Sequence, residues 1–270
     1  MKTICICNQK GGVGKTTTTI NIGAGLAKLG KRVLLIDLDS QGNLTATMQQ
    51  NEEEGQKLTA NELIYFSVAG VPYTIDQMIR HNEGEHLDYI AASPLLSTAP
   101  NLIANDPDSN TVLERILRAP ELADYDYVLC DCKPSLDLLV ANTLVAADGV
   151  IIPVEPEAYA VDGLVTLCGN VSRTHDQLNE RLHIIGILIT KADYRRRQTK
   201  ETEAELRECF GDQMFKATIP ILAEAAAAAK EQRSAVSGRC SRVGELYTVV
   251  AQEVIDRCEK SGDRICDIAH

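Results

Sequence analysis

Short apolar runs alternate along the chain with segments whose apolar residues recur at helical spacing. Runs of strand length occupy residues 3–7, 32–37, 87–92, 127–131, 150–154 and 184–190. Helical spacing marks residues 18–29, 75–80, 111–118, 199–209 and 223–230, and one face of a last helix carries Val243, Leu246, Val250, Val254 and Cys258. The polar, acidic residues 51–56 are expected to form a surface loop. Because strands and helices alternate without an evident linker, the pattern predicts one α/β domain over residues 1–270, with a doubly wound, mainly parallel sheet flanked by helices.

Composition narrows the range of partners. Apolar residues make up 44% of the 270 positions, which is ample for a core, but aromatic residues make up only 4%, so aliphatic packing must dominate. The formal net charge is −11, and an acidic surface repels nucleic acid and anionic membranes at long range. Any contact with DNA would therefore need a local basic patch.

The nine cysteines have neither the spacing of a disulfide framework nor that of a zinc site. Cys5 and Cys7 lie two apart on an expected strand, as do Cys130 and Cys132, so each pair shares one face of the sheet. The sequence contains no secretory signal and no membrane-spanning run. These features indicate a reduced cytoplasmic protein that uses its cysteines as small apolar residues.

The first strand run is joined to the first helical segment by Lys10-Gly11-Gly12-Val13-Gly14-Lys15-Thr16-Thr17. A strand, a glycine-rich loop and a helix N-terminus form a phosphate cradle, because glycines let backbone N–H groups point at an anion and the helix dipole adds positive potential. In such a loop Lys15 would reach the β- and γ-phosphates, and the Thr16 hydroxyl would bind Mg²⁺. Residues 10–17 are therefore predicted to bind a nucleoside triphosphate.

The loop departs from the usual P-loop pattern, because Gln9 stands where a glycine is common and Lys10 adds a second lysine at its start. It resembles the deviant Walker A loop of the ParA/MinD family of P-loop ATPases. The resemblance implies that Lys10 reaches across a homodimer to the nucleotide of the partner subunit and takes part in catalysis with Lys15. The simpler alternative is a glycine turn with a solvated lysine.

Three aspartates follow expected strands, and ligands bind where the strands of a parallel sheet end. Asp131 ends the run 127–131, which fits a Walker B strand whose carboxylate holds Mg²⁺ through a water. Asp37 ends the run 32–37, and Asp39 follows two residues later, a spacing that lets both project toward one site. The alternative is that such aspartates only cap loops or helices.

Further segments extend the resemblance along most of the chain. Residues 35–43 are similar to a D-x-D-P-Q-G-N segment of the family, which implies that Asp39 activates the attacking water and that Asp37 supports the metal shell. Ser40 replaces the proline of that segment. Residues 131–136 resemble D-x-P-P-S-L, but Lys133 takes a proline position, which removes rigidity from a loop expected to sense the γ-phosphate and adds a positive charge. Residues 152–157 are similar to a P-V-x-P-E segment near the dimer interface.

Two segments bear on the choice of base. Residues 189–193 resemble a degenerate guanine-reading N-K-x-D element, and also the T-x-x-D form usual in the family. Residues 218–220 resemble the I-P segment beside the adenine. The family resemblance implies ATP, bound in part by Thr190 and Pro220, with GTP as the alternative and a plain helix cap as the alternative role for Asp193.

One dense basic run, residues 194–197, opens a helical segment that continues through Lys200 and Arg207. In the DNA-partitioning members of the family, basic residues of this region bind the DNA backbone. The resemblance therefore implies non-specific, salt-dependent DNA binding by Arg195, Arg196, Arg197 and Lys200. On general grounds such a run is a solvated helix start. The arginine that often follows I-P is absent, and other sources of charge are Lys230, Arg233, Arg239 and Arg242.

Together these features favour a compact ParA/Soj-like ATPase without a separate N-terminal DNA-binding domain. ATP would join two subunits, the dimer would bind DNA on the nucleoid, and a ParB-type partner would stimulate hydrolysis, so that a plasmid, mobile element or chromosome is segregated.

Two other classes stay open on the sequence. A MinD-like ATPase would need an amphipathic C-terminal membrane helix, whereas residues 258–270 are polar, mixed in charge and interrupted by glycine, which argues against membrane binding. A metabolic P-loop ligase or an iron–sulfur reductase is the third class. The reductase would need two cysteines per subunit at a cluster, and Cys132 lies near such a position while Cys168 has no obvious partnering motif.

Overall fold

The computed structural model describes residues 1–49, 57–238 and 240–260. The expected surface loop at residues 51–56 lies outside these ranges, as do Arg239 and the polar tail from residue 261 onward.

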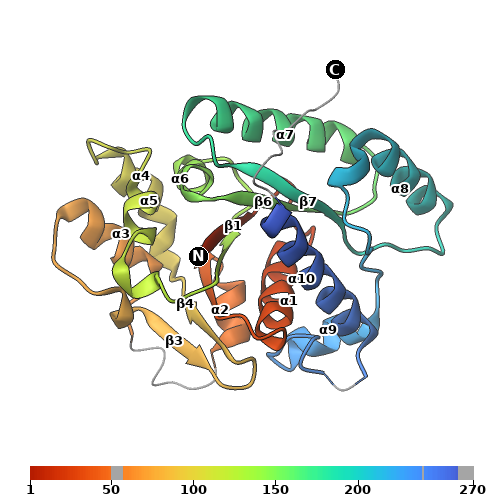
Figure 1. Cartoon of the computed structure of the whole chain (residues 1–270), viewed down its shortest axis with the longest axis horizontal. Helices are drawn as coiled ribbons and strands as arrows, with labels where there is room; N and C mark the ends of the chain where they lie inside the picture. Colours follow the sequence, from red (N-terminus) through yellow and green to blue (C-terminus); the bar gives the residue numbers. More distant parts are fainter. Residues whose placement is uncertain (50–56, 239, 261–270) are drawn as a thin grey trace.

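A central sheet organises the chain (Figure 1). The strands are β1 (Lys2–Ile6), β2 (Val33–Leu38), β3 (Ile79–Asn82), β4 (Leu87–Ile90), β5 (Tyr127–Cys132), β6 (Gly149–Val154) and β7 (His183–Ile189). Within the described residues they form one seven-stranded sheet in the order β3-β4-β2-β5-β1-β6-β7. All neighbours pair in parallel except β3, which runs antiparallel to β4 at one edge. The prediction of a mainly parallel, doubly wound sheet is confirmed.

The helices form a layer on each face of the sheet (Figure 1). Their bounds are α1 (Lys15–Lys28), α2 (Asn43–Met48), α3 (Ala60–Ala69), α4 (Ala99–Ala104), α5 (Val112–Leu117), α6 (Leu138–Ala146), α7 (Ala160–Gln177), α8 (Arg197–Phe210), α9 (Ala223–Lys230) and α10 (Arg242–Lys260). Short 3₁₀ turns occupy Ile75–Gln77, Pro94–Thr98, Pro120–Leu122 and Gly211–Gln213. Helices α3 to α8 supply one buried cluster, whereas α1, α2, α9 and α10 supply the other.

Alternation along the strands sends neighbouring side chains to opposite layers. On β1, Ile4 and Ile6 face the cluster that contains α1 and α10, and Cys5 faces the other. Cys7, Cys130 and Cys132 join Cys5 in that second cluster, and all four are at most 1% exposed. These cysteines therefore act as small core residues, as predicted from their spacing.

One element was predicted wrongly. Residues 75–80 have helical spacing, but the structure places only a 3₁₀ turn at Ile75–Gln77 and then begins strand β3 at Ile79. The strand buries Arg80 and Asn82 while His81 is exposed, so its buried face is polar. A search for alternating apolar residues cannot detect such a strand. Its antiparallel pairing with β4 explains why it needs no helical crossover.

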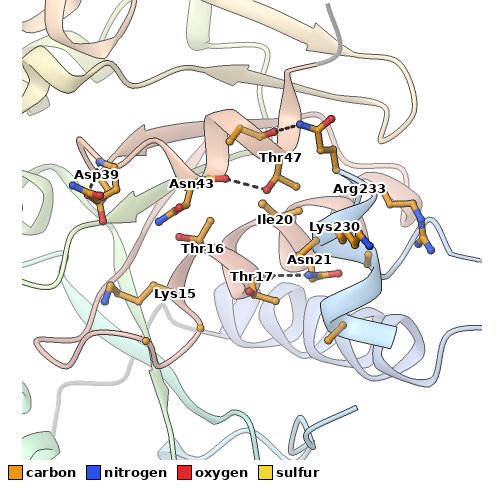
Figure 2. A pocket seen from close by; sticks show the side chains of 18 of the residues that line it. Lys15, Thr16, Thr17, Ile20, Asn21, Asp39, Asn43, Thr47, Lys230 and Arg233 are labelled. Atoms are coloured by element: carbon orange, nitrogen blue, oxygen red, sulfur yellow. Dashed lines mark hydrogen bonds between the residues drawn. The ribbon is translucent and has the colours of Figure 1, made fainter. Parts of the chain in front are cut away.

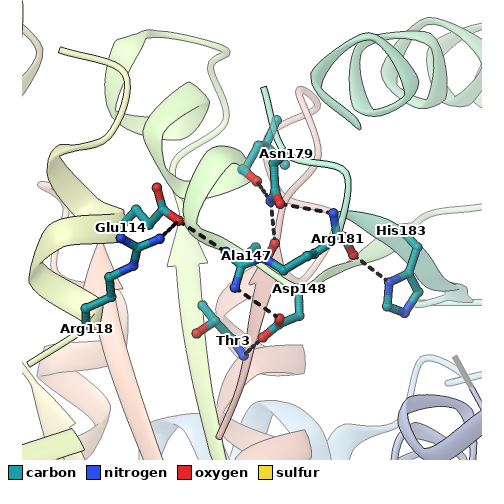
Figure 3. Close-up of polar contacts among 9 residues, drawn as sticks. Thr3, Glu114, Arg118, Ala147, Asp148, Asn179, Arg181 and His183 are labelled. Carbon is teal, nitrogen blue, oxygen red and sulfur yellow. Dashed lines mark hydrogen bonds and ion pairs between the residues drawn. The ribbon is translucent and has the colours of Figure 1, made fainter. Parts of the chain in front are cut away.

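Polar contacts tie the connections at the amino ends of the central strands (Figure 3). The backbone N–H of Thr3 donates to Oδ2 of Asp148 at 2.7 Å, and Asn179 donates to the carbonyl oxygen of Ala147 at 2.7 Å. These bonds fix the starts of β1, β6 and β7. The opposite edge of the sheet, where β1, β2 and β5 end, is left for the loops that carry the candidate site.

Candidate active site

The glycine-rich loop leaves the carboxyl end of β1 and leads directly into α1. Gly12 and Gly14 have φ angles of 77° and 83°, in the left-handed region that L side chains rarely adopt. Gly14 is the N-cap of α1 and provides no side chain to cap that helix end. The first N–H groups of α1 and the positive end of its dipole are therefore available to bind an anion.

Two lysines contact backbone carbonyl groups of this loop. Lys15, 7% exposed, donates from Nζ to the carbonyl oxygen of Lys10 at 3.2 Å, and its burial lowers the pKa of the ammonium group. Lys191 donates from Nζ to the carbonyl oxygen of Gly12. Phosphate oxygens are stronger acceptors for a lysine than these neutral carbonyl groups. Both lysine side chains can therefore exchange these carbonyl contacts for phosphate oxygens when a phosphate chain binds.

A cavity of about 910 Å³ opens beside the loop (Figure 2). Such a volume suits a nucleotide. Its lining includes Asp39 and, from the loop and the start of α1, the predicted residues Gly12, Gly14, Lys15, Thr16 and Thr17. Lys230 and Arg233 line it from the side of α9, as Figure 2 shows. The structure therefore brings the phosphate-binding residues and the predicted water-activating carboxylate to one cavity.

Other predicted nucleotide-binding residues lie behind the cavity or outside it. Gly11, Val13, Thr190 and Pro220 are not among the described residues that line it. Thr190 is buried, and its hydroxyl donates to the carbonyl oxygen of Val13 at 2.7 Å. Pro220 pairs through its backbone with Ala192, next to this segment. In the structure Thr190 and Pro220 support the loop and its neighbours.

Asp37 and Asp131 are register partners at the ends of β2 and β5, and both are at most 1% exposed. Burial raises the pKa of Asp131 to about 8, and the neighbouring Asp37 adds to the rise. Oδ1 of Asp131 accepts a hydrogen bond from Thr19 at 3.3 Å, whereas its buried Oδ2 has no hydrogen-bond partner among the described residues. A spare carboxylate oxygen beside a phosphate loop fits a cation that arrives with the phosphates.

Asp37 uses both carboxylate oxygens to hold the next loop. Its Oδ2 accepts hydrogen bonds from the backbone N–H and the hydroxyl of Thr45, at 2.9 and 2.7 Å. Its Oδ1 accepts the backbone N–H of Asp39 at 3.1 Å. Burial raises the pKa of Asp37 to about 6. Asp37 therefore fixes the backbone that presents Asp39 to the cavity, and Oδ1 of Asp39 in turn accepts the N–H of Gln41 at 3.0 Å.

Lys10 lies on the surface and contacts the loop that follows β6. Its Nζ lies 2.6 Å from Oε2 of Glu157, and the two side chains are 48% and 47% exposed. The hydrogen bond from Lys10 lowers the pKa of Glu157. Two residues further on, Tyr159 is 84% exposed and has a φ of 65°. The second lysine of the loop thus stands on an exposed surface that also carries an aromatic side chain.

The basic run lies at the start of α8 and is compensated by local acids. The guanidinium group of Arg195 donates two hydrogen bonds to Asp193, at 2.7 and 2.8 Å, and Arg196 pairs with the same carboxylate at 3.5 Å. Arg197 pairs with Glu201 at 2.6 Å, and Lys200 is exposed. Side-chain exposures of 84%, 72% and 91% leave the three arginines accessible. Lys230 and Arg233, by contrast, line the cavity and are not part of this run.

One residue of the site, Lys191, was not predicted from the sequence. It lines the cavity and contacts the loop, although only its neighbour Thr190 was predicted to act there. Its φ of 52° in a residue other than glycine marks a special position, but that angle has no sequence signal. The adjacent T-K-x-D pattern offered the only hint.

The cysteine chemistry of a reductase finds no support in the described residues. Cys132 is 1% exposed and Cys168 is fully buried, so neither reaches a surface where two subunits could share a cluster. Sγ of Cys132 lies 3.4 Å from Sγ of Cys5 inside the core. No group of three or more histidine, cysteine or acidic residues suited to a metal ion occurs in the part of the chain that the structure describes.

A doubly wound parallel sheet with a glycine-rich loop between β1 and α1, and a Walker B aspartate on the neighbouring strand, defines a P-loop nucleoside-triphosphate-binding protein. A family model for the AAA domain matches residues 1–184. The chromosome-partitioning ATPase Soj of Thermus thermophilus is 39% identical over 264 residues, covering 97% of this chain and 98% of that protein. The sporulation initiation inhibitor protein Soj of Bacillus subtilis is 37% identical over 254 residues, covering 94% and 98%.

A solved structure shares the whole architecture. Cobyrinic acid a,c-diamide synthase from Mycobacterium smegmatis, with bound ATP analogue and magnesium, matches with a TM-score of 0.80 at 27% identity over 98% of both chains. The chain belongs to the ParA/Soj family of P-loop ATPases. This confirms the family and the ATPase class that the loop and the further segments predicted.

Proposed function

We propose that this ATPase is a partitioning motor that binds ATP with Mg²⁺, dimerises face to face, binds DNA without sequence preference and hydrolyses ATP when a ParB-type partner stimulates it. The cargo would be a plasmid, a mobile element or a chromosome, and the protein would act in the cytoplasm on the nucleoid. The observation that carries the proposal is the pair of loop lysines. Lys15 is buried at the phosphate cradle, while Lys10 of the same loop is exposed.

The phosphate chain of ATP would lie along the loop and α1. The N–H groups at the start of α1 and Nζ of Lys15 would bind the phosphates, and Lys191 would exchange its carbonyl contact for a phosphate oxygen. Mg²⁺ would be held by the Thr16 hydroxyl and, through water, by the unpartnered Oδ2 of Asp131. Bound there, the ion would neutralise charge that develops on the phosphates during hydrolysis.

Asp39 would orient the attacking water. It lines the cavity, and hydrogen bonds from its own N–H to Asp37 and from Gln41 to its side chain hold it in position. Rigid placement of a carboxylate at the γ-phosphate end is what water activation requires. Among the described residues, Oδ2 of Asp39 accepts no hydrogen bond, which leaves that oxygen for the water.

The dimer would form through the surface around Lys10. In a twofold dimer each Lys10 would enter the site of the other subunit, and the exposed Tyr159 beside it would supply apolar contact. ATP would be required, because the partner's lysine needs a phosphate to bind. Dependence of dimerisation on the triphosphate follows from this arrangement.

DNA binding would use Arg195, Arg196, Arg197 and Lys200. The chain as a whole carries a charge of −11, so these residues would have to act as a local patch on an acidic body. Two copies of the patch in a dimer would double the number of phosphate contacts. Because DNA phosphates would compete with Asp193 and Glu201 for the arginines, binding should be weak in the monomer and strongly dependent on salt.

Binding of the Asp39→Ala protein to random-sequence duplex DNA tests this function. We expect binding with ATP but not with ADP or without nucleotide. The logarithm of the binding constant should fall linearly with the logarithm of the salt concentration, with a slope of about −0.9 for each phosphate contact. Replacing Arg195 and Arg197 by Glu should remove DNA binding. Replacing Arg118 by Glu should leave DNA binding unchanged, because this exposed arginine lies at the end of α5, where it pairs with Glu114, and is not part of the basic run. Absence of binding at low salt in every nucleotide state would refute DNA partitioning.

The likeness to a diamide synthase supplies a second candidate, a P-loop ligase that consumes ATP only with a small acid substrate. Stimulation of ATP turnover separates the two, since a partitioning ATPase responds to DNA with a protein partner.

Among the described residues, no helix is long and apolar enough to span a bilayer.

A further inference from the structure

Lys133 stands in the cavity that holds the phosphate loop. It follows β5 directly, two residues after Asp131, and lines the same cavity as Lys15 and Asp39. Its side chain is only 17% exposed, although it belongs to a loop whose next three residues are exposed. A lysine placed inward from an exposed loop needs a partner, because burying an unpaired ammonium group is costly.

The partner of Lys133 is Asp137, at the start of α6. The Nζ atom of Lys133 forms an ion pair with Oδ2 of Asp137. Oδ1 of the same carboxylate caps the helix, accepting the N–H groups of Leu139 at 3.2 Å and Val140 at 3.3 Å. The capping oxygen and the lysine-binding oxygen are thus different atoms. Asp137 can release Lys133 and still cap α6.

Three of the lysines that line the cavity differ in the groups that they contact. Lys15 and Lys191 contact neutral carbonyl groups of the loop itself, whereas Lys133 is held by a full negative charge. A ligand that draws Lys133 away from Asp137 must therefore bring more negative charge than one that only displaces carbonyl contacts. The terminal phosphate is the part of a nucleoside triphosphate that brings this extra charge.

We propose that Lys133 is a γ-phosphate-binding residue of its own subunit, which exchanges Asp137 for the terminal phosphate when ATP binds. The inference rests on the nucleotide site proposed above and deepens it. Lys133 would distinguish ATP from ADP within one subunit, before Lys10 of a second subunit arrives. Lys133 directly precedes the exposed segment 134–136. Its exchange of partners would therefore also change the conformation of this surface segment according to the nucleotide bound.

Nucleotide affinities of the whole chain test the proposal, measured by calorimetry with Mg²⁺ and either a non-hydrolysable ATP analogue or ADP. Lys133→Ala should lower the affinity for the ATP analogue about tenfold, which is the typical loss for a charge-assisted hydrogen bond. The affinity for ADP should change by no more than about twofold. Asp137→Asn keeps a good helix cap and removes the competing charge, so it should tighten the ATP analogue about threefold. In the double variant the effect of Asp137→Asn should vanish.

Lys230→Ala is the matched control, since Lys230 also lines the cavity but from the side of α9. Its effect on the two nucleotides should be equal. Equal effects of Lys133→Ala on both nucleotides, or none, would overturn the proposal and make the Lys133–Asp137 pair a structural contact. Lys133→Gln repeats the test with a side chain that is longer than alanine but uncharged. Retained ADP binding shows that each Lys133 variant is folded. Failure of the unmodified protein to bind either nucleotide would instead refute the proposed nucleotide site.

Discussion

The contact between Lys10 and Glu157 makes a quantitative prediction about dimerisation. In the proposed dimer, Lys10 would have to leave Glu157 before it could reach a partner's nucleotide, so Glu157→Gln should favour the dimer. The pair is close, at 2.6 Å, but both side chains are about half exposed. Exposed ion pairs of this kind contribute about 0.2–1 kcal/mol, because water and salt screen them.

A twofold dimer breaks two such contacts, one in each subunit. The cost is then about 0.4–2 kcal/mol, which corresponds to a change of about two- to thirtyfold in the dimerisation constant. Glu157→Gln should strengthen ATP-dependent dimerisation by this factor, and the gain should shrink as salt is added. Lys10→Ala should weaken dimerisation while ATP binding by the monomer persists, since Lys10 does not line the cavity of its own subunit.

Sedimentation velocity with a non-hydrolysable ATP analogue measures both variants over a protein concentration series. Glu83→Gln, an exposed substitution on the hairpin between β3 and β4, controls for the change in net charge. If Glu157→Gln weakens the dimer as strongly as Lys10→Ala does, Glu157 is itself a ligand of the partner and not a resting contact for Lys10. If Lys10→Ala abolishes monomer binding and dimerisation together, the across-interface role of Lys10 is wrong.

Three further predictions concern the site and the basic run. Lys15→Ala should weaken ATP binding by at least about tenfold, because a charge-assisted contact is lost. Lys28→Ala, at the far end of α1, should leave ATP binding unchanged. Unchanged ATP affinity of the Lys15→Ala protein would refute the phosphate cradle. Asp39→Ala should slow hydrolysis about 10²- to 10⁴-fold while ATP binding persists, and normal single-turnover rates would remove it from the mechanism. The Asp193 carboxyl should titrate with a pKa of about 2, held low by hydrogen bonds from Arg195. Its stabilising contact should therefore persist above pH 4 and be lost as the pH falls through 2. Arg195→Ala should raise the pKa of Asp193 toward its ordinary value in a carboxyl NMR titration, while Arg196 and the backbone N–H of residue 195 keep part of the lowering.

The parts of the fold that were predictable depend on local chemistry. Aliphatic runs at β1, β5 and β6 are buried on both sides, so their composition alone identifies them as inner strands of a parallel sheet. The phosphate loop is local as well, because the left-handed angles at Gly12 and Gly14 need glycine and the helix follows at once. Right-handed crossovers, which strand–helix–strand units strongly favour, narrow the possible strand orders, but they do not by themselves give the order β3-β4-β2-β5-β1-β6-β7.

Contacts between distant segments were not predictable from one sequence. Lys191 meets Gly12 across 179 positions, and Lys10 meets Glu157 across 147. No periodicity or motif encodes such pairs, because each depends on how β1, β6 and β7 are placed side by side. Strand β3 was missed for a different reason, since its buried residues are polar and pair within the fold.

The arrangement of the cavity cations suggests an order in which a nucleotide engages them. Carbonyl contacts of Lys15 and Lys191 are replaced by any phosphate chain, because a neutral acceptor yields to a charged one. The ion pair of Lys133 with Asp137 yields only to an acceptor with comparable charge at close range. ADP would therefore satisfy the first two lysines and leave the third on Asp137. ATP would engage all three lysines, so a single subunit would distinguish the triphosphate from the diphosphate before a second subunit contributes Lys10.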